Sequence, residues 1–278
     1  MTNSSERMGI LVDTTKCMGC RGCQVACKQW QGLEAEKTTF FGGAGYQNPP
    51  ALSADTFTLV TFTETEDAKG LHWTFAKRGC MHCDDPACVS VCPVGALHKE
   101  ANGAVTYEAD KCIGCRYCMM ACPWSVPSYQ WSSPVPFVRK CTMCNDRMQL
   151  GKAPACVGGC PTGALQFGRR EDLLKEAHAR IANNPDHYVN HIYGEKEAGG
   201  TSVMYLSAVP FTELGFPEVP LHKMSQDAER VMKILPWWVA GLGVFLTGTY
   251  ALSERRKRIA AERAAAEGSQ VKQEGGEL

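Results

Sequence analysis

CIGCRYCMMACP, residues 112–123, contains four cysteines at the spacing C-x2-C-x2-C-x3-C and a proline directly after the last of them. A tight loop with this spacing brings three thiolates to three corners of a [4Fe–4S] cube, and the fourth cysteine starts a helix. The same spacing occurs in CMGCRGCQVAC, residues 17–27. Residues 80–92 widen one gap of the pattern, and residues 141–160 insert a longer loop. We therefore expect a fold organised around metal clusters that are held by cysteine loops.

All sixteen cysteines of the 278-residue chain belong to these four stretches. Structural zinc usually takes two separated C-x2-C hooks, so a third cysteine two residues further on would leave surplus thiolates at every site. Disulfide frameworks are typical of smaller secreted domains, and cysteines this close along the chain are poorly placed to bridge each other. The spacing therefore favours four [4Fe–4S] clusters over both alternatives. The quartets are Cys17, Cys20, Cys23 and Cys27; Cys80, Cys83, Cys88 and Cys92; Cys112, Cys115, Cys118 and Cys122; and Cys141, Cys144, Cys156 and Cys160.

The pairing of the quartets predicts how the domain is organised. In two-cluster ferredoxins the helix-borne fourth cysteine points away from its own loop and ligates the neighbouring cluster. Quartets two and three are thus expected to form one pair, and quartets one and four a second pair around it. The predicted fold class is α+β, with two interleaved ferredoxin-like modules in residues 8–224 and one transmembrane helix after them. Module one would comprise residues 8–30 with 137–170, and module two residues 72–130.

Local patterns outside the cysteine loops predict several regular elements. An internal repeat, CPVGALHKE at 92–100 and CPTGALQFG at 160–168, follows the last cysteine of two quartets. Alternating apolar and polar residues indicate strands, and apolar residues at helical spacing indicate an amphipathic helix. The expected elements are a strand at 8–12, a helix from the first quartet through Trp30, a hairpin of 56–63 with 71–77, a strand at 103–107 and a helix over 169–183.

Residues 234–253 contain no charged side chain. A helix of this length spans about 30 Å, the hydrocarbon core of a bilayer. Trp237 and Trp238 at one end match an interfacial belt, and the basic run at 255–258 closes the other end, so a membrane-spanning helix is favoured over a buried soluble one. By the positive-inside rule the charged tail, residues 254–278, is predicted to be cytoplasmic and the cluster domain to lie on the opposite face.

Other function classes lack support in the sequence. The chain has 29 basic and 29 acidic residues, which offers no electrostatic footprint for nucleic acid. Neither a Gly-rich phosphate loop nor an H-E-x-x-H motif is present, and the seven histidines are scattered, so we expect no catalytic residue. Cations near the loops are expected to offset the clusters' negative charge. They are Arg21, Lys28, Lys77, Arg78, Arg116, Arg139, Lys140 and Arg147.

The order of the four quartets resembles that in the iron–sulphur subunits of the molybdopterin oxidoreductase superfamily. Within that superfamily the C-terminal helix and several stretches resemble most the beta subunit of membrane-bound formate dehydrogenase. These stretches are CKQW at 27, FTETE at 62, GCMHCDDPAC at 79, APACVGGCPTGAL at 153 and GGTSVMYL at 199.

The resemblance implies an electron-transfer subunit of a bacterial complex of anaerobic respiration, itself without catalytic activity. Its partners would be a molybdenum or tungsten catalytic subunit with a molybdopterin cofactor, a cytochrome b-type membrane subunit that reduces quinone, and the lipid bilayer. It would be a single-pass protein of the cytoplasmic membrane with its cluster domain on the periplasmic side. It would be exported on the partner's twin-arginine signal, since residues 1–17 contain no apolar run typical of a signal peptide.

The resemblance also implies four ligand sets, ordered from the catalytic partner to the membrane. The formate dehydrogenase function has one alternative of the same class, the equivalent subunit of a membrane-bound hydrogenase or of a sulphur-compound or sulphoxide reductase. A function of a different class is that of a zinc-scaffolded membrane adaptor. The implied sets are Cys17, Cys20, Cys23 and Cys160; Cys141, Cys144, Cys156 and Cys27; Cys80, Cys83, Cys88 and Cys122; and Cys112, Cys115, Cys118 and Cys92.

Overall fold

The computed structural model describes residues 7–38, 47–67 and 70–274 of the chain. The chain divides into two compact units, Met1–Gln226 and Asp227–Leu278, which we describe separately. All sixteen cysteines lie in the first unit.

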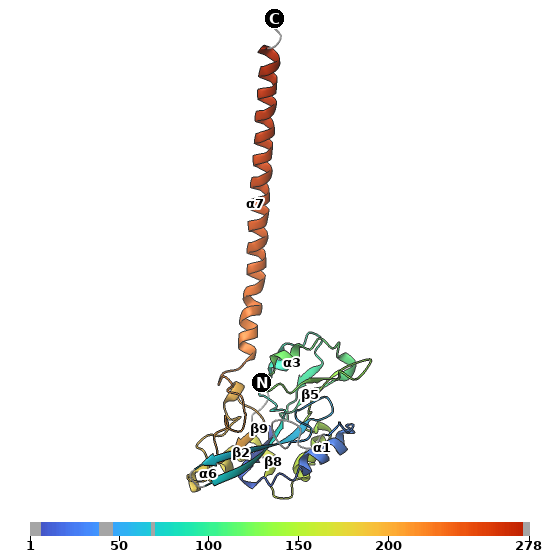
Figure 1. The fold of residues 1–278 in the computed structure, drawn as a ribbon, viewed down its shortest axis with the longest axis vertical. Helices are drawn as coiled ribbons and strands as arrows, with labels where there is room; N and C mark the ends of the chain where they lie inside the picture. Colours follow the sequence, from blue (N-terminus) through green and yellow to red (C-terminus); the bar gives the residue numbers. More distant parts are fainter. Residues whose placement is uncertain (1–6, 39–46, 68–69, 275–278) are drawn as a thin grey trace. The chain divides into compact units, whose positions relative to one another are not determined.

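The first unit contains a three-stranded sheet in the order β8-β1-β9 (Figure 1). The central strand β1, Met8–Asp13, pairs antiparallel with β8, Leu165–Arg169, and parallel with β9, Val203–Leu206. The strand expected at 8–12 is therefore confirmed. Strand β9 is not predictable from local pattern, because all four of its residues are buried and its sequence shows no alternation of apolar and polar residues.

Helix α6, Arg170–Asn183, packs on β1 and β8. Its buried Leu173, Ala177 and Ile181 recur at helical spacing and join one apolar cluster with residues of β1 and β9. The amphipathic helix predicted over 169–183 is confirmed, with its first residue one position later.

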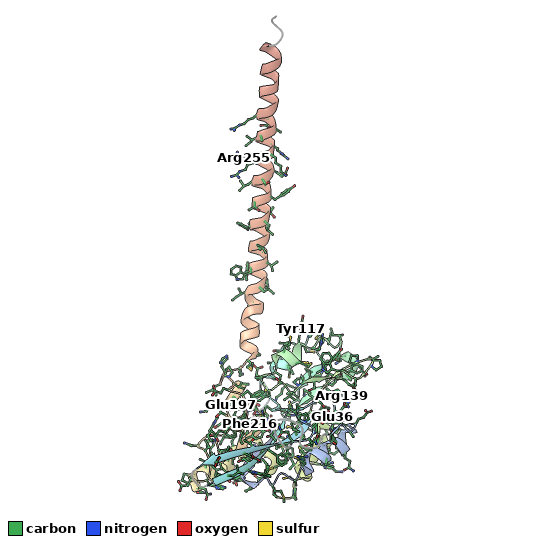
Figure 2. All side chains as sticks on the ribbon, viewed as in Figure 1. Glu36, Tyr117, Arg139, Glu197, Phe216 and Arg255 are labelled. Atoms are coloured by element: carbon green, nitrogen blue, oxygen red, sulfur yellow. The ribbon has the colours of Figure 1, made fainter. Side chains whose placement is uncertain are left out.

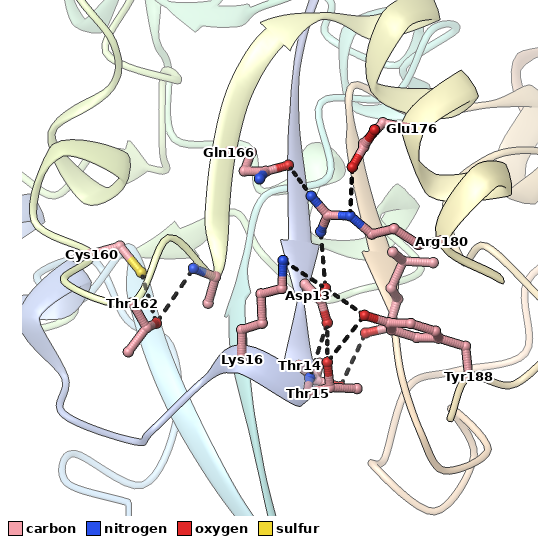
Figure 3. Close-up of polar contacts among 12 residues, drawn as sticks. Asp13, Thr14, Thr15, Lys16, Cys160, Thr162, Gln166, Glu176, Arg180 and Tyr188 are labelled. Carbon is pink, nitrogen blue, oxygen red and sulfur yellow. Dashed lines mark hydrogen bonds and ion pairs between the residues drawn. The ribbon is translucent and has the colours of Figure 1, made fainter. Parts of the chain in front are cut away.

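A buried carboxylate at the end of β1 fixes the start of the first cysteine loop (Figure 3). The side chain of Asp13 is only 1% exposed, and Arg180 of α6 donates to it from Nη1 at 2.9 Å. The Tyr188 hydroxyl donates to the same carboxylate at 3.0 Å. Asp13 also caps the short 3₁₀ helix η2, Thr14–Lys16, by accepting the Thr15 N–H. The chain therefore leaves η2 at Cys17 in a fixed direction.

A long hairpin leads to the second quartet. Strand β2, Thr58–Asp67, pairs antiparallel with β3, Gly70–Gly79, from Thr58↔Gly79 to Asp67↔Gly70. The predicted hairpin is confirmed, and both of its strands are longer than the alternating patterns indicated. Cys80 follows directly after β3.

Short elements surround the remaining cysteines. Strand β4 pairs with β5, the strand expected at 103–107, and β6 pairs with β7. Helix α1 packs against α5, and α2 packs against α3, so each of these contacts joins elements of two different quartets. The bounds are α1 Gly22–Gln31, α2 Ala87–Ser90, β4 Leu97–Lys99, β5 Val105–Tyr107, η3 Ala109–Lys111, α3 Tyr117–Ala121, β6 Ser128–Tyr129, β7 Val138–Arg139, α4 Asn145–Gln149, α5 Ala155–Gly158 and η4 Glu197–Gly199.

The second unit consists almost entirely of helix α7, Ser225–Glu274. The segment Lys233–Arg263 of α7 is long and apolar enough to cross a membrane, and its apolar stretch is not buried within the protein. Figure 2 shows side chains projecting from the helix, among them Arg255 in the basic run. The observed helix includes the predicted span 234–253 and continues into the tail. A long apolar C-terminal helix of this kind is consistent with a single-pass membrane anchor.

Candidate metal centres

The first cysteine group lies where two loops distant in sequence meet. Cys17 and Cys20 come from the loop between η2 and α1, Cys23 is the second residue of α1, and Cys160 follows α5; all four line one small cavity. The loop turns tightly at Gly19, whose φ of +69° favours glycine. The Gly22 N–H lies 3.5 Å from Cys20 Sγ and donates to it.

Two glycines allow α1 and α5 to approach each other closely. A Cβ atom on Gly22 would lie 2.6 Å from the carbonyl oxygen of Gly159. A Cβ atom on Gly159 would lie 2.8 Å from Cβ of Ala26. Since real Cβ atoms do not approach other atoms this closely, the contact requires glycine at both positions. It brings Cys160 to the first cysteine loop.

The second group contains Cys27, Cys141, Cys144 and Cys156. Burial raises the pKa of Cys27 to about 11; a hydrogen bond with Thr58 opposes this shift, and the neighbouring Cys156 and Cys144 add to it. Burial also raises the pKa of Cys141, with Cys27, Cys80 and Cys156 among its electrostatic neighbours. These neighbours place Cys27, the last cysteine of the first quartet, among the first three cysteines of the fourth quartet.

The third group contains Cys80, Cys83, Cys88 and Cys122. Burial raises the pKa of Cys83 well above its usual value, and the nearby Cys80, Cys88 and Cys122 raise it further. The expectation that the fourth cysteine starts a helix is wrong for Cys122, which is the residue directly after α3 ends. The last cysteine of the third quartet thus lies among the first three of the second.

The fourth group contains Cys92, Cys112, Cys115 and Cys118, which line a second small cavity. Burial raises the pKa of Cys118 to about 11, and Cys112, Cys115 and Cys92 contribute to the shift in that order. Backbone N–H groups donate to two of these sulphurs: Gly114 to Cys112 at 3.4 Å and Ala96 to Cys92 at 3.2 Å.

The first and third quartets adopt the same backbone conformation. Gly19 and Gly114 both have a φ of +69°, and Arg21 and Arg116 have φ of +60° and +64°. A short 3₁₀ helix precedes each loop, and a helix follows each of these arginines. The similarity in sequence therefore extends to a repeated loop structure.

The residues present fit [4Fe–4S] clusters. None of the sixteen cysteines forms a disulfide, and thiolate is the soft ligand that iron–sulphur clusters require. Within the described residues, no three or more His, Cys, Asp or Glu side chains are arranged to hold a single metal ion. The cysteines of the first and of the fourth implied set each line one cavity. All four ligand sets stay a prediction.

Besides Thr58 at Cys27 and Tyr107 at Cys112, two further side chains that the sequence did not indicate hydrogen-bond to cysteine sulphurs. Gln31 Nε2 lies 3.8 Å from Cys144 Sγ, and Thr162 Oγ1 lies 3.7 Å from Cys160 Sγ (Figure 3). Hydrogen bonds of this kind raise the potential of a ligated cluster. Thr162 is the variable residue of the repeated C-P-x-G motif. This motif is the only sequence pattern that could have drawn attention to Thr162.

Most of the expected cations near the loops interact with groups other than cysteine. Arg139 forms an ion pair with Asp55 at 3.0 Å. Arg147 lies 4.4 Å above the ring of Trp30, and Arg116 lies 5.3 Å from the ring of Tyr129. Lys77 and Lys140 differ from these because both are buried beside the cysteine groups.

Comparison with known proteins supports the same cofactor. Family models described as "4Fe-4S dicluster domain" match residues 71–170 and residues 16–96. The two matches overlap, so they do not by themselves divide the chain into modules. Two dicluster models and sixteen cysteines support four [4Fe–4S] clusters.

Relatives of the chain cover most of its length. It is 44% identical over 257 residues to a protein of Nitratidesulfovibrio vulgaris, covering 91% of this chain and 69% of the relative. It is 40% identical over 222 residues to the formate dehydrogenase-O iron-sulfur subunit of Escherichia coli K12, covering 77% of this chain and 72% of the relative. It is 37% identical over 259 residues to the hydrogenase-2 operon protein HybA of Escherichia coli O157:H7, covering 82% of this chain and 78% of the relative.

Proposed function

The chain belongs to the family of iron–sulphur subunits that includes those of formate dehydrogenase, and from this we propose that it relays electrons between a formate-oxidising catalytic subunit and the membrane. The catalytic partner would contain molybdopterin with molybdenum or tungsten, and the membrane partner would be a cytochrome b-type subunit that reduces quinone. When bound, the clusters supply one-electron storage and transfer. The chain would supply their ligands and their electrostatic surroundings, without catalysing a reaction itself.

The observation that carries the proposal is the 40% identity to the formate dehydrogenase-O iron-sulfur subunit over most of both chains. The cysteine groups support it, because four groups of four thiols are what a four-cluster relay requires. We propose that cluster one, nearest the catalytic partner, and cluster two belong to module one, whereas clusters three and four belong to module two. The proposed ligands are Cys17, Cys20, Cys23 and Cys160 for cluster one; Cys141, Cys144, Cys156 and Cys27 for cluster two; Cys80, Cys83, Cys88 and Cys122 for cluster three; and Cys112, Cys115, Cys118 and Cys92 for cluster four.

A hydrogenase partner is the second candidate, and the 37% identity to HybA over 82% of the chain favours it. The relay would be built in the same way, because the cluster ligands belong to this chain and not to its partner. The two candidates differ in the identity of the large subunit and in the electron donor.

Purification in mild detergent through a tag on this chain tests the proposal. We expect the complex to be brown, to contain about sixteen iron atoms per chain if four clusters are present, and to reduce a dye with formate. Hydrogen-dependent dye reduction without formate activity would assign the chain to the second candidate. A colourless preparation with stoichiometric zinc would contradict both.

We also propose that α7 crosses the cytoplasmic membrane once, with the tail inside and the cluster domain outside. The basic run at 255–258 supports this orientation. Protease added to cells with a permeabilised outer envelope should cleave in the first unit and spare an epitope placed after residue 278. Loss of the epitope with an intact first unit would indicate the opposite orientation.

A further inference from the structure

Lys77 lies between the first two cysteine groups. It belongs to β3, its side chain is buried, and it lines the same cavity as Cys17, Cys20, Cys23 and Cys160. Its charge also interacts with Cys156 and Cys141 of the second group. A Cβ atom on Gly79 would lie 3.2 Å from Lys77 Nζ, so the glycine before Cys80 leaves room for the ammonium group.

Lys77 has no carboxylate partner in the part of the chain that the structure describes. Its strongest electrostatic neighbours are Cys156, Tyr205, Cys141 and Cys23. Burying an ammonium group costs several kcal/mol unless an anion compensates for it. The ordinary pKa of lysine is about 10.4, so Lys77 is charged at neutral pH where anionic cluster thiolates offset the cost of its burial. The anions available to this ammonium group are the sulphurs of the two cysteine groups.

We propose that Lys77 is a fixed positive charge shared by clusters one and two, and that it raises the reduction potentials of both. The proposal rests on the proposed function, since it concerns the clusters of the electron relay. A cluster with four thiolate ligands is anionic, and reduction adds one more negative charge. A buried cation stabilises the reduced form strongly, because neither water nor salt screens the interaction well. A cation between two clusters also offsets their mutual repulsion when both are reduced.

The next residue on the strand, Arg78, provides a matched control. Its guanidinium lies 3.9 Å above the ring of Phe216, and Nη2 donates to the Gly215 carbonyl at 2.9 Å. Its electrostatic neighbours are Tyr205 and Tyr193, not cysteines. Replacing Arg78 therefore removes one positive charge from β3 without removing it from between the cysteine groups.

The test is a redox titration of the purified complex, followed by EPR, for the natural chain, Lys77→Met, Lys77→Arg and Arg78→Met. In Lys77→Met, reduction of two of the four clusters should become at least tenfold less favourable, which is about 59 mV for one electron. The two shifted signals should be those that Cys23→Ser and Cys144→Ser alter. Lys77→Arg should keep potentials close to those of the natural chain, and Arg78→Met should leave the potentials of clusters one and two unchanged.

Several results would overturn the inference. Unchanged potentials in Lys77→Met, or an equal shift in Arg78→Met, would show that Lys77 exerts no specific effect. Loss of iron from both Lys77→Met and Lys77→Arg would show a packing role. Loss of iron from Lys77→Met alone, with normal potentials in Lys77→Arg, would support the requirement for charge at this position. An absence of iron from the natural chain would instead overturn the proposed function, so the two failures are distinguishable.

Discussion

Cys122→Ser is expected to alter the EPR signal of the cluster built on Cys80, Cys83 and Cys88, although Cys122 lies more than thirty residues further along the chain. The reason is the third cysteine group, in which Cys122 is an electrostatic neighbour of Cys83 and Cys88. A serine oxygen is a harder ligand than a thiolate, so it should shift the potential of that cluster or convert it to a three-iron form.

Cys115→Ser is the matched control for this prediction, because it removes a thiolate of the same quartet. Cys115 lines the cavity of the fourth group together with Cys92, Cys112 and Cys118. The two variants should therefore alter different signals, which can be separated by their midpoint potentials. If both variants alter the same signal, each quartet closes its own cube and the proposed ligand sets are wrong.

Gly22→Ala is expected to destabilise the contact between α1 and α5 by about 1–3 kcal/mol, the usual cost of overpacking. The added Cβ would lie 2.6 Å from the Gly159 carbonyl oxygen, and a backbone atom cannot turn away as a flexible side chain can. Separation of the two helices would move Cys160 away from the first cysteine loop. We expect a lower midpoint of thermal bleaching, measured by visible absorbance, and a lower iron content.

Gly158→Ala is the control for Gly22→Ala, since Gly158 is the neighbour of Gly159 and lies at the end of α5. A Cβ atom there meets nothing within 4 Å, and its φ is not positive. This variant should bleach at the same temperature as the natural chain or slightly above it. Equal decreases in the bleaching midpoint and iron content of both variants would show that the close approach of α1 and α5 does not limit stability.

The sequence predicted the parts of the fold that local patterns determine. Cysteine spacing indicated the cofactor, because the geometry of a cluster imposes it within a few residues. Alternation located the β2–β3 hairpin, and helical periodicity located α6. These predictions depended on interactions between residues that are close along the chain.

The features that the sequence did not reveal depend on distant contacts. Strand β9 forms because β1 offers it a buried edge, and its own residues show no strand periodicity. The Asp13 carboxylate binds Arg180 and Tyr188, which lie more than 160 residues away. Lys77 was one of eight cations near the loops, and only its position in the fold distinguishes it from its neighbour Arg78.

The pairing of β1 with β8 and β9 has a consequence for folding during synthesis. The hairpin of β4 with β5 and the contact of α2 with α3 involve residues 87–121 only, so they can form while the ribosome is still translating the rest of the first unit. β1 cannot complete its sheet until residue 206 has emerged, which takes on the order of ten seconds or more at bacterial elongation rates. The N-terminal strand has no strand partner until β8 has emerged, and its sheet stays incomplete until β9 follows, so the early part of the nascent chain is the part that most needs protection from oxidation and aggregation.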